Sequence, residues 1–412
     1  MPIPLYVRDD KKEGKDMSNN DPIVIVGSAR TPMGGMQGDF SDLTAAQLGS
    51  DAIKAAVERA GVAAGDVKEV IFGNVLGAGQ GQAPARQATL GAGLELKTGC
   101  TTINKMCGSG MKATMLAHDL IKAGVNDVMV SGGMESMTNA PYLLQKARSG
   151  MRLGHGEVKD HMFLDGLEDA YDKGRLMGTF AEETATAYQF TREEQDNFAI
   201  RSLERANTAI NDGSFKGEIT PVTIKSRKGE RVVEIDEQPG KAMPEKIPTL
   251  RPAFAKDGTV TAANSSSISD GAAALVLMRE SEAEKRGLKP LARILGHSTF
   301  AQEPNLFTTA PVFAMKALLE QVGWSKDDVD LWEINEAFAV VTMAAIRDLE
   351  LDADKVNVHG GACALGHPIG ASGARIIVTL LAALEKYGKK NGVASLCIGG
   401  GEATAMAFER IV

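Results

Sequence analysis

Cysteine and histidine side chains stand in glycine-rich segments of this sequence, a combination that can support covalent catalysis. Cys107 lies in "NKMCGSGMKA", where a polar turn leads into a run of helix-forming residues. Unpaired backbone N–H groups and the helix dipole favour an anion at such a position, so we expect the pKa of this thiol to lie below its usual value of about 8.5. The pattern predicts a nucleophilic cysteine at the start of a helix from Met111 to Lys122. A buried structural cysteine is the alternative.

A second glycine-rich segment supplies a histidine that can act on that thiol. The stretch "NVHGGACALGHPIGASGAR" contains His359, Cys363 and His367. Proline after His367 disfavours helical backbone at the histidine, and a helix follows the loop. Because a base beside a thiol is the usual arrangement for an activated nucleophile, we predict that His367 pairs with Cys107.

Two further candidate residues stand at the ends of apolar strands. Cys397 comes before three glycines in "SLCIGGGEA", and Asn335 follows the strand of "EINEAFA". Ligands of α/β proteins bind at strand ends, which makes both positions candidates for the same site. For Cys397 the alternative is a cysteine buried in the strand core.

The positions of these segments follow from an internal repeat. "AIKAAVERAG" ends at Gly61 and resembles "AMKALLEQVG", which ends at Gly323, 262 positions later. "VMVSGGME" and "SLCIGGGE" also resemble each other, at a spacing of 267. We expect Gly73 and Ser131 to be the counterparts of Asn335 and Cys397. A period this long indicates two homologous domains rather than a solenoid.

Each half alternates short apolar strands with amphipathic helices, which predicts an α/β sandwich. The segment between the halves has no counterpart after the second half and is read as an inserted domain. We expect a leader or tag at 1–20, an N-terminal domain at 21–137 and 270–289, an inserted loop domain at 138–269, and a C-terminal domain at 290–412.

Composition excludes several classes of protein. The 412 residues carry a net charge of -8, which argues against an overall basic surface for nucleic acid. No apolar run of about 18 residues is present, so we expect no membrane span. The four cysteines form no CxxC pair, so we expect neither a metal site nor a disulfide framework, and we predict a cytoplasmic protein. The leader is too acidic for an organellar transit peptide.

Taken together, these motifs resemble the thiolase family. "NKMCGSG", "NEAFA", "GHPIGASGAR" and "CIGGG" stand in the family's order and spacing, and "SISDGAAALVLM" at 267–278 is a fifth match. The resemblance extends from about residue 21 to residue 412. It implies a duplicated α/β/α/β/α sandwich with an inserted loop domain, and an acyltransferase of fatty acid metabolism that condenses two acetyl-CoA molecules to acetoacetyl-CoA and coenzyme A.

The resemblance also implies the roles of the catalytic residues. Cys107 would carry the acyl group, and His367 would take its proton. Cys397 would move a proton on or off the second substrate or the leaving thiol. Asn335 would hold a water that forms one oxyanion hole with His367, and the N–H groups of Cys107 and Gly399 would form the other.

Substrate contacts and assembly are implied in the same way. Coenzyme A and acyl-CoA would be the substrates, and no cofactor would be permanently bound. The chain would assemble as a homotetramer (a dimer of dimers) or as a dimer, and it would bind neither nucleic acid nor a membrane. The basic residues Lys225, Arg227 and Lys228 of the inserted domain are candidates for the phosphates of coenzyme A. The expected substrate-binding residues are Ser266, Ala263, Met177, Leu176, Phe338 and Phe307. No tyrosine stands where some relatives bind potassium, so no potassium site is expected.

Four alternatives compete with this reading of the sequence. A degradative 3-ketoacyl-CoA thiolase for longer acyl chains stays open. A decarboxylating ketoacyl synthase usually lacks a second cysteine, and a non-catalytic relative usually lacks both, so Cys107 and Cys397 argue against these two. "GAGQGQ" at 77–82 does not have the spacing of a dinucleotide-binding loop.

Overall fold

The computed structural model describes residues 21–226 and 229–411. The predicted leader at 1–20 lies outside the described residues, as do Arg227 and Lys228. Within the described ranges, no helix combines the length and apolar composition that a bilayer crossing requires.

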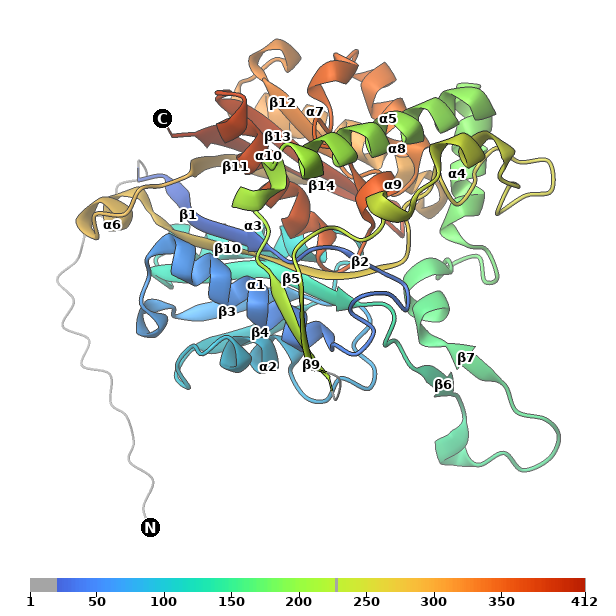
Figure 1. Ribbon diagram of the computed structural model, residues 1–412, viewed down its shortest axis with the longest axis horizontal. Coiled ribbons are helices and arrows are strands. Elements are labelled where there is room, and N and C mark those ends of the chain that lie inside the picture. Colours follow the sequence, from blue (N-terminus) through green and yellow to red (C-terminus); the bar gives the residue numbers. More distant parts are fainter. Residues whose placement is uncertain (1–20, 227–228, 412) are drawn as a thin grey trace.

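Ten strands of the described chain form one hydrogen-bonded sheet that has an N-terminal and a C-terminal half. The two halves join where β1 and β11 pair over three residues each, Ile23–Ile25 and Ala292–Ile294. The order is β4 (Gly99–Ile103), β3 (Glu69–Gly73), β5 (Val128–Ser136), β10 (Ser269–Arg279), β1 (Ile23–Arg30), β11 (Ala292–Ala301), β14 (Glu402–Arg410), β13 (Asn391–Ile398) and β12 (Leu331–Ile334), with β2 (Gly34–Gly35) beside β10. Figure 1 shows the N-terminal strands in the lower part of the molecule and the C-terminal strands in the upper part.

Helices cover both halves of the sheet and fill the space between them. α1 (Ala45–Ala60) and α2 (Pro84–Gly91) pack on the outer face of the N-terminal half. α7 (Ala310–Val322) and α8 (Ala339–Asp348) pack on the outer face of the C-terminal half. α3 (Ser109–Lys122) and α10 (Ser372–Lys386) share one core with strands of both halves. The predicted α/β/α/β/α sandwich is therefore confirmed.

The internal repeat reappears in the equivalent positions of α1 and α7, β3 and β12, and α3 and α10. α1 and α7 both end at a left-handed glycine, Gly61 with φ 65° and Gly323 with φ 70°, as the repeat predicts. The expected match of Cys397 with Ser131 is wrong. β3 pairs Ile71 with Ser131. Glu333, which stands 262 positions after Ile71 and is its repeat partner in β12, pairs with Ala394. Ala394, and not Cys397, is therefore the counterpart of Ser131.

Glycines bring the first turns of α3 and α10 into contact. A Cβ atom on Gly110 would lie 2.8 Å from the Ala374 nitrogen, and one on Gly373 would lie 2.4 Å from the Met111 nitrogen. Only glycine permits so close an approach of two backbones. The loops that precede the two helices, and that carry Cys107 and His367, are therefore held side by side.

The segment at 138–269 leaves the sheet after β5 and returns at β10. It contains the hairpin of β6 and β7, which projects from the body in Figure 1, the helices α4 and α5, and the hairpin of β8 and β9. Thr191 and Glu194 form a capping box at the start of α5. The bounds are β6 (Tyr142–Leu144), β7 (Val158–Asp160), α4 (Met177–Tyr188), α5 (Arg192–Asn211), β8 (Val222–Ser226) and β9 (Gly229–Val233), and two short helices follow later in the chain, α6 (Glu280–Lys285) and α9 (Ala362–Leu365).

Candidate active site

Cys107 lies on a strained turn between β4 and α3. The preceding Met106 has φ 47°, a left-handed conformation that is uncommon for a residue with a side chain. Asn104 Oδ1 accepts a hydrogen bond from the Met106 N–H at 2.9 Å. Ser109 Oγ accepts from the Lys105 N–H at 2.8 Å and donates to the Met106 carbonyl at 2.6 Å. α3 begins at Ser109, two residues before the predicted Met111, because this serine ties the turn to the helix.

The thiol of Cys107 is not acidified. Burial raises its pKa to about 11, although the backbone N–H groups of Gly399 and of Cys107 itself favour the thiolate. The carboxylate of Glu135 adds to the rise. The expectation of a lowered pKa is therefore wrong, because removal from water outweighs two N–H groups. At neutral pH Cys107 rests as a neutral thiol.

His367 lies buried in the loop before α10, and its environment defines its tautomer. Its Nδ1 atom lies 2.6 Å from Ser372 Oγ, and this hydroxyl donates its single hydrogen to the Pro368 carbonyl at 3.0 Å. Ser372 must then accept a hydrogen bond from Nδ1–H, which leaves the lone pair on Nε2. Among the described residues, the buried Nε2 atom has no hydrogen-bond partner.

The protonation state of His367 suits a base. Burial, together with the charge of Arg375, lowers its pKa to about 3. His367 is therefore a neutral imidazole whose free Nε2 can accept a proton.

Glu135, which the sequence analysis missed, holds this histidine loop against β3. Its carboxylate lies at the end of β5 and is fully buried. The loop is so close to β5 that a Cβ atom on Gly133 would lie 2.0 Å from the Gly370 carbonyl oxygen. Burial raises the pKa of Glu135 to about 7. The carboxylate accepts hydrogen bonds from the N–H groups of Val75 at 3.0 Å, Leu76 at 3.1 Å and Gly370 at 2.9 Å, and from Asn74 Nδ2 at 2.7 Å.

Cys397 and Asn335 lie at neighbouring strand ends. The Asn335 N–H donates to the Ser395 carbonyl at 3.0 Å, which places Asn335 beside β13. Cys397 is fully buried, and burial together with the adjacent Cys107 raises its pKa well above the usual value. Asn335 is also buried, and neither its Oδ1 nor its Nδ2 atom finds a partner in the described part of the chain. A buried amide in this state is available to a substrate group or a bridging water.

An apolar cluster surrounds the thiol of Cys397. Phe307, Phe338 and Met177 belong to this cluster, so the structure groups half of the six expected substrate-side residues around one thiol. A Cβ atom on Gly399 would lie 3.3 Å from the Met177 sulfur, so Met177 also covers the glycine next to Cys107. Leu176 lies outside the cluster, just before α4, and Ala263 packs against α5 and α9 instead.

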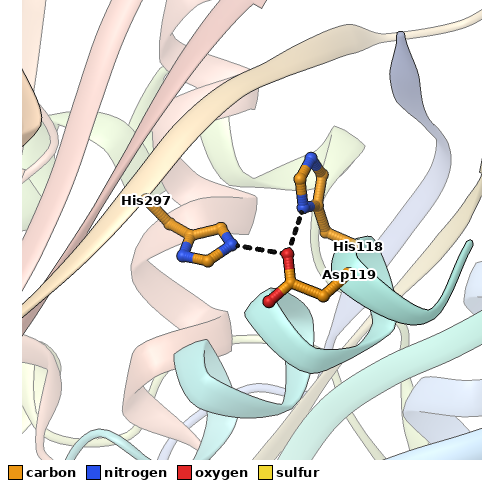
Figure 2. Close-up of side chains that lie close together, drawn as sticks. All are labelled: His118, Asp119 and His297. Carbon is orange, nitrogen blue, oxygen red and sulfur yellow. Dashed lines mark hydrogen bonds and ion pairs between the residues drawn. The ribbon is translucent and has the colours of Figure 1, made fainter. Parts of the chain in front are cut away.

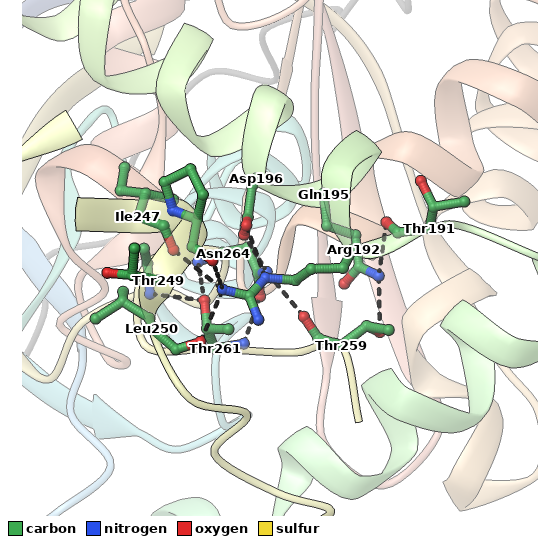
Figure 3. Close-up of polar contacts among 12 residues, drawn as sticks. Thr191, Arg192, Gln195, Asp196, Ile247, Thr249, Leu250, Thr259, Thr261 and Asn264 are labelled. Atoms are coloured by element: carbon green, nitrogen blue, oxygen red, sulfur yellow. Dashed lines mark hydrogen bonds and ion pairs between the residues drawn. The ribbon is translucent and has the colours of Figure 1, made fainter. Parts of the chain in front are cut away.

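Ser266 is positioned against the "NEAFA" segment by a polar anchor. The Ser266 N–H donates to the Ala337 carbonyl at 3.0 Å. Asn264 Nδ2 donates to Asp196 Oδ1 at 3.0 Å, and Arg192 Nε donates to Asp196 Oδ2 at 2.7 Å (Figure 3). Arg192 also binds the carbonyl groups of Ile247 and Leu250 at 3.0 and 2.9 Å. α5 therefore fixes the position of the segment that carries Ser266 relative to the "NEAFA" segment.

The remaining singled-out residues lie in other surroundings. Cys363 donates its backbone N–H to the buried Glu336 carboxylate at 3.1 Å, and His359 packs against the rings of Phe215 and Tyr387. Lys225 pairs with Glu230 across the β8–β9 hairpin at 3.3 Å. These positions are explained by local packing and pairing.

Comparison with protein families matches nearly the whole chain. The family model described as "Thiolase, N-terminal domain" matches residues 23–281, and "Thiolase, C-terminal domain" matches residues 288–410. The two matches together include every candidate residue of the site.

Individual relatives extend this similarity. The chain is 52% identical to acetyl-CoA acetyltransferase 2 of Arabidopsis thaliana, over 94% of this chain and 96% of that protein. It is 50% identical to acetyl-CoA acetyltransferase B, mitochondrial, of Xenopus laevis, over 94% of this chain and 92% of that protein. The crystal structure of Acat5 thiolase from Ascaris suum in complex with coenzyme A superposes with a TM-score of 0.90 at 42% identity, over 95% of this chain and 100% of that chain.

Proposed function

The chain belongs to the thiolase family, and we propose that it is an acetyl-CoA C-acetyltransferase. The reaction is the reversible Claisen condensation of two acetyl-CoA molecules to acetoacetyl-CoA and coenzyme A, through an acetyl group on Cys107. The observation that carries this proposal is the pair of thiols formed by the half-buried Cys107 and the buried Cys397, which lie close together beside the Gly399 N–H. The names of the relatives favour an acetyl donor over a longer acyl chain.

In the first half-reaction, Cys107 Sγ attacks the thioester carbonyl while its proton passes to Nε2 of His367. The bond between the carbonyl carbon and the sulfur of coenzyme A breaks, and the leaving sulfur takes the proton of Cys397, or a proton from solvent in a variant that lacks this thiol. The N–H groups of Cys107 and Gly399 stabilise the oxyanion, and the loss of one such donor typically slows a reaction by about 10²–10³. The action of the Gly399 N–H on the resting thiol supports this arrangement.

In the second half-reaction, the Cys397 thiolate removes a proton from the α-carbon of the second acetyl-CoA. The carbanion attacks acetyl-Cys107, whose sulfur leaves and recovers its proton from His367. Asn335, through a water, and His367 hold the enolate oxygen of the second substrate. The burial that raises the pKa of Cys397 makes its thiolate a strong base, and every group ends in its starting protonation state.

Separation of the two half-reactions tests this proposal. Cys397→Ala should still accept a radiolabelled acetyl group on Cys107, because the pair of Cys107 and His367 is intact. Condensation should fall by at least about 10², the usual contribution of a positioned acid or base. Cys107→Ala is the control that loses the label, and His367→Ala should slow acetylation itself by at least about 10². Equal loss of both half-reactions in Cys397→Ala, or loss of neither, would contradict the assignment.

The acyl preference needs its own experiment. Phe307, Phe338 and Met177 enclose Cys397 with bulky side chains, which favours a short acyl group. Thiolysis rates should be measured with coenzyme A over a series from acetoacetyl-CoA to 3-ketohexadecanoyl-CoA. We expect acetoacetyl-CoA to react fastest, whereas a preference for the long chain would assign a degradative 3-ketoacyl-CoA thiolase.

Coenzyme A is proposed to bind as a substrate over the inserted segment, with no permanently bound cofactor. Ser266 and Ala263 would contact its pantetheine arm, and the structure of the Ascaris relative in complex with coenzyme A supports such a site. Ser266→Trp should raise the KM for coenzyme A while the far-ultraviolet circular dichroism stays unchanged. An unchanged KM would count against this placement.

A homotetramer built from dimers is the proposed assembly, with a dimer as the alternative. The arm of β6 and β7 projects from the body and exposes Tyr142, Leu144 and Val158 by 68%, 52% and 60%, an apolar surface that a partner subunit would cover (Figure 1). Light scattering coupled to size-exclusion chromatography tests the assembly.

We propose a cytoplasmic location because all four cysteines are free thiols, which suits a reducing compartment. The name of the Xenopus relative describes it as mitochondrial. Cell fractionation that recovers the present protein in mitochondria would contradict a cytoplasmic location.

A further inference from the structure

Three side chains that can ligate a metal ion meet at the far end of α3 from Cys107. His118 and Asp119 belong to α3, and His297 belongs to β11. Asp119 Oδ1 lies 2.9 Å from His118 Nδ1 and 2.9 Å from His297 Nε2 (Figure 2). One ligand atom from each residue can be chosen so that all three lie within 4.8 Å of one another. His118 lies roughly 14 Å along the axis from the first residue of α3, so the group is separate from the catalytic thiols.

We propose that His118, Asp119 and His297 bind a divalent first-row transition ion, for which Zn²⁺ is the best fit. Two imidazole nitrogens and one carboxylate oxygen form a donor set that suits zinc. Tetrahedral coordination with bonds of about 2.0–2.2 Å separates ligand atoms by about 3.3 Å. The contacts of His118 and His297 with Asp119 therefore need to open by about 0.4 Å, and the two imidazole ligand atoms, which lie within 4.8 Å of each other, need to reach the same separation. A water completes the coordination.

Exposure gives an ion access to this position. The side chain of Asp119 is 51% exposed and that of His297 is 18% exposed, whereas His118 is 9% exposed and fixes the inner side of the site. The second carboxylate oxygen, Oδ2, is turned away from both rings in Figure 2, so neither histidine engages it.

The protonation states of the group suit a metal ligand set. Burial acts to raise the pKa of Asp119, but the hydrogen bonds from His297 and His118 lower it overall, so this group is a carboxylate. Burial lowers the pKa of His118, which keeps it neutral. Ligation by Nδ1 of His118 and by Nε2 of His297 requires a lone pair on each of these atoms, so the proton of a neutral ring must lie on its other nitrogen. Lys122 is the nearby cation that acts on His118, and its repulsion of the ion is opposed by the charge of Asp119.

Such an ion would join the two halves of the chain. α3 packs on the N-terminal half of the sheet, and β11 pairs with β14 of the C-terminal half. Binding to the folded chain alone stabilises it by mass action. The expectation of no metal site considered only the cysteines. No local motif indicates this group, because His297 stands 178 positions after Asp119.

The test uses full-length, tag-free protein that has been stripped with a chelator and is titrated with Co²⁺ as a spectroscopic substitute for Zn²⁺. We expect one equivalent of Co²⁺ to bind with visible d–d absorption and without a thiolate-to-cobalt charge-transfer band, and Zn²⁺ to raise the thermal midpoint. His297→Gln and Asp119→Asn, both at the surface, should abolish the absorption and the thermal shift. His155→Gln, which changes an exposed histidine of the β6–β7 arm, is the matched control and should retain both.

Three results would overturn the proposal. A charge-transfer band would place the ion on the cysteines, and an unchanged titration of His297→Gln would place it elsewhere in the chain. A wild-type protein that binds no Co²⁺ at micromolar concentration would show that the three side chains form a hydrogen-bonded group only.

Discussion

Replacement of Ser372 by alanine tests how the structure prepares His367 for catalysis. Ser372 Oγ is the acceptor that holds the imidazole proton on Nδ1, at 2.6 Å. Without it, the Nδ1–H tautomer loses about 0.5–1.5 kcal/mol, the usual net worth of a hydrogen bond, relative to the tautomer whose Nε2 carries the proton. The second tautomer cannot take a proton from Cys107. A change of this size alters the tautomer ratio by about 2- to 13-fold, and we expect acetylation to slow within that range.

Single-turnover release of coenzyme A from acetyl-CoA measures this step. Thr89→Ala in α2 is the matched control, because Thr89 Oγ1 donates to the Ala85 carbonyl four residues earlier at 2.7 Å, just as Ser372 donates to Pro368. Both variants lose a buried hydroxyl, but only Ser372 contacts an imidazole. Acetylation at the wild-type rate in Ser372→Ala would refute the tautomer argument. Equal slowing in Thr89→Ala would show that the effect arises from general destabilisation.

Three further predictions follow from the burial of polar groups. Because burial raises the pKa of Cys107 to about 11, its alkylation by iodoacetamide should accelerate about tenfold per pH unit from about pH 7 to about pH 10, and a plateau above about pH 8 would contradict this. Asn264→Ala removes the 3.0 Å hydrogen bond to the buried Asp196 and loosens the segment that carries Ser266. Steady-state kinetics should therefore give a higher KM for coenzyme A with a smaller change in kcat. An unchanged KM would show that the hydrogen bond between Asn264 and Asp196 does not position Ser266. Burial lowers the pKa of His359 to about 4, so below about pH 6.5 the unfolded chain binds a proton that the folded chain does not, and stability falls as the pH drops. This histidine should account for about 2 kcal/mol of the stability lost between about pH 6.5 and about pH 5; urea unfolding of His359→Asn should lack that loss, and an equal pH dependence would refute the assignment.

Local patterns in the sequence were sufficient for the architecture. The alternation of apolar strands with amphipathic helices and the similarity of α1 to α7 can each be recognised within short segments, and the structure confirms both. The register of the strands was harder to predict from the sequence. The match of Cys397 with Ser131 failed because a shift of a few residues between two glycine-rich strands leaves the sequence similarity almost unchanged, whereas it changes which side chains share a strand end.

The missed parts of the site depend on contacts between distant segments. Glu135 and Gly370 are 235 positions apart, and no periodicity connects them. Ser372 stands five residues after His367, at the start of the helix that follows the loop, and this short spacing is visible in the sequence. A serine that closes a histidine loop onto a helix is the signal that could have indicated a second role.

The pKa of Cys107 shows most clearly why local reasoning stops short. A helix start acts over one turn and favours the thiolate, but burial is a property of the whole fold and here has the larger effect. Burial also lowers the pKa of His367 to about 3, so the two residues rest as a neutral thiol and a neutral imidazole. Charge can separate between them only when an incoming carbonyl oxygen receives the negative charge next to the N–H groups of Cys107 and Gly399. On the proposed mechanism, the activation of the nucleophile therefore comes from the bound thioester, and the resting enzyme keeps its thiol protected from other electrophiles.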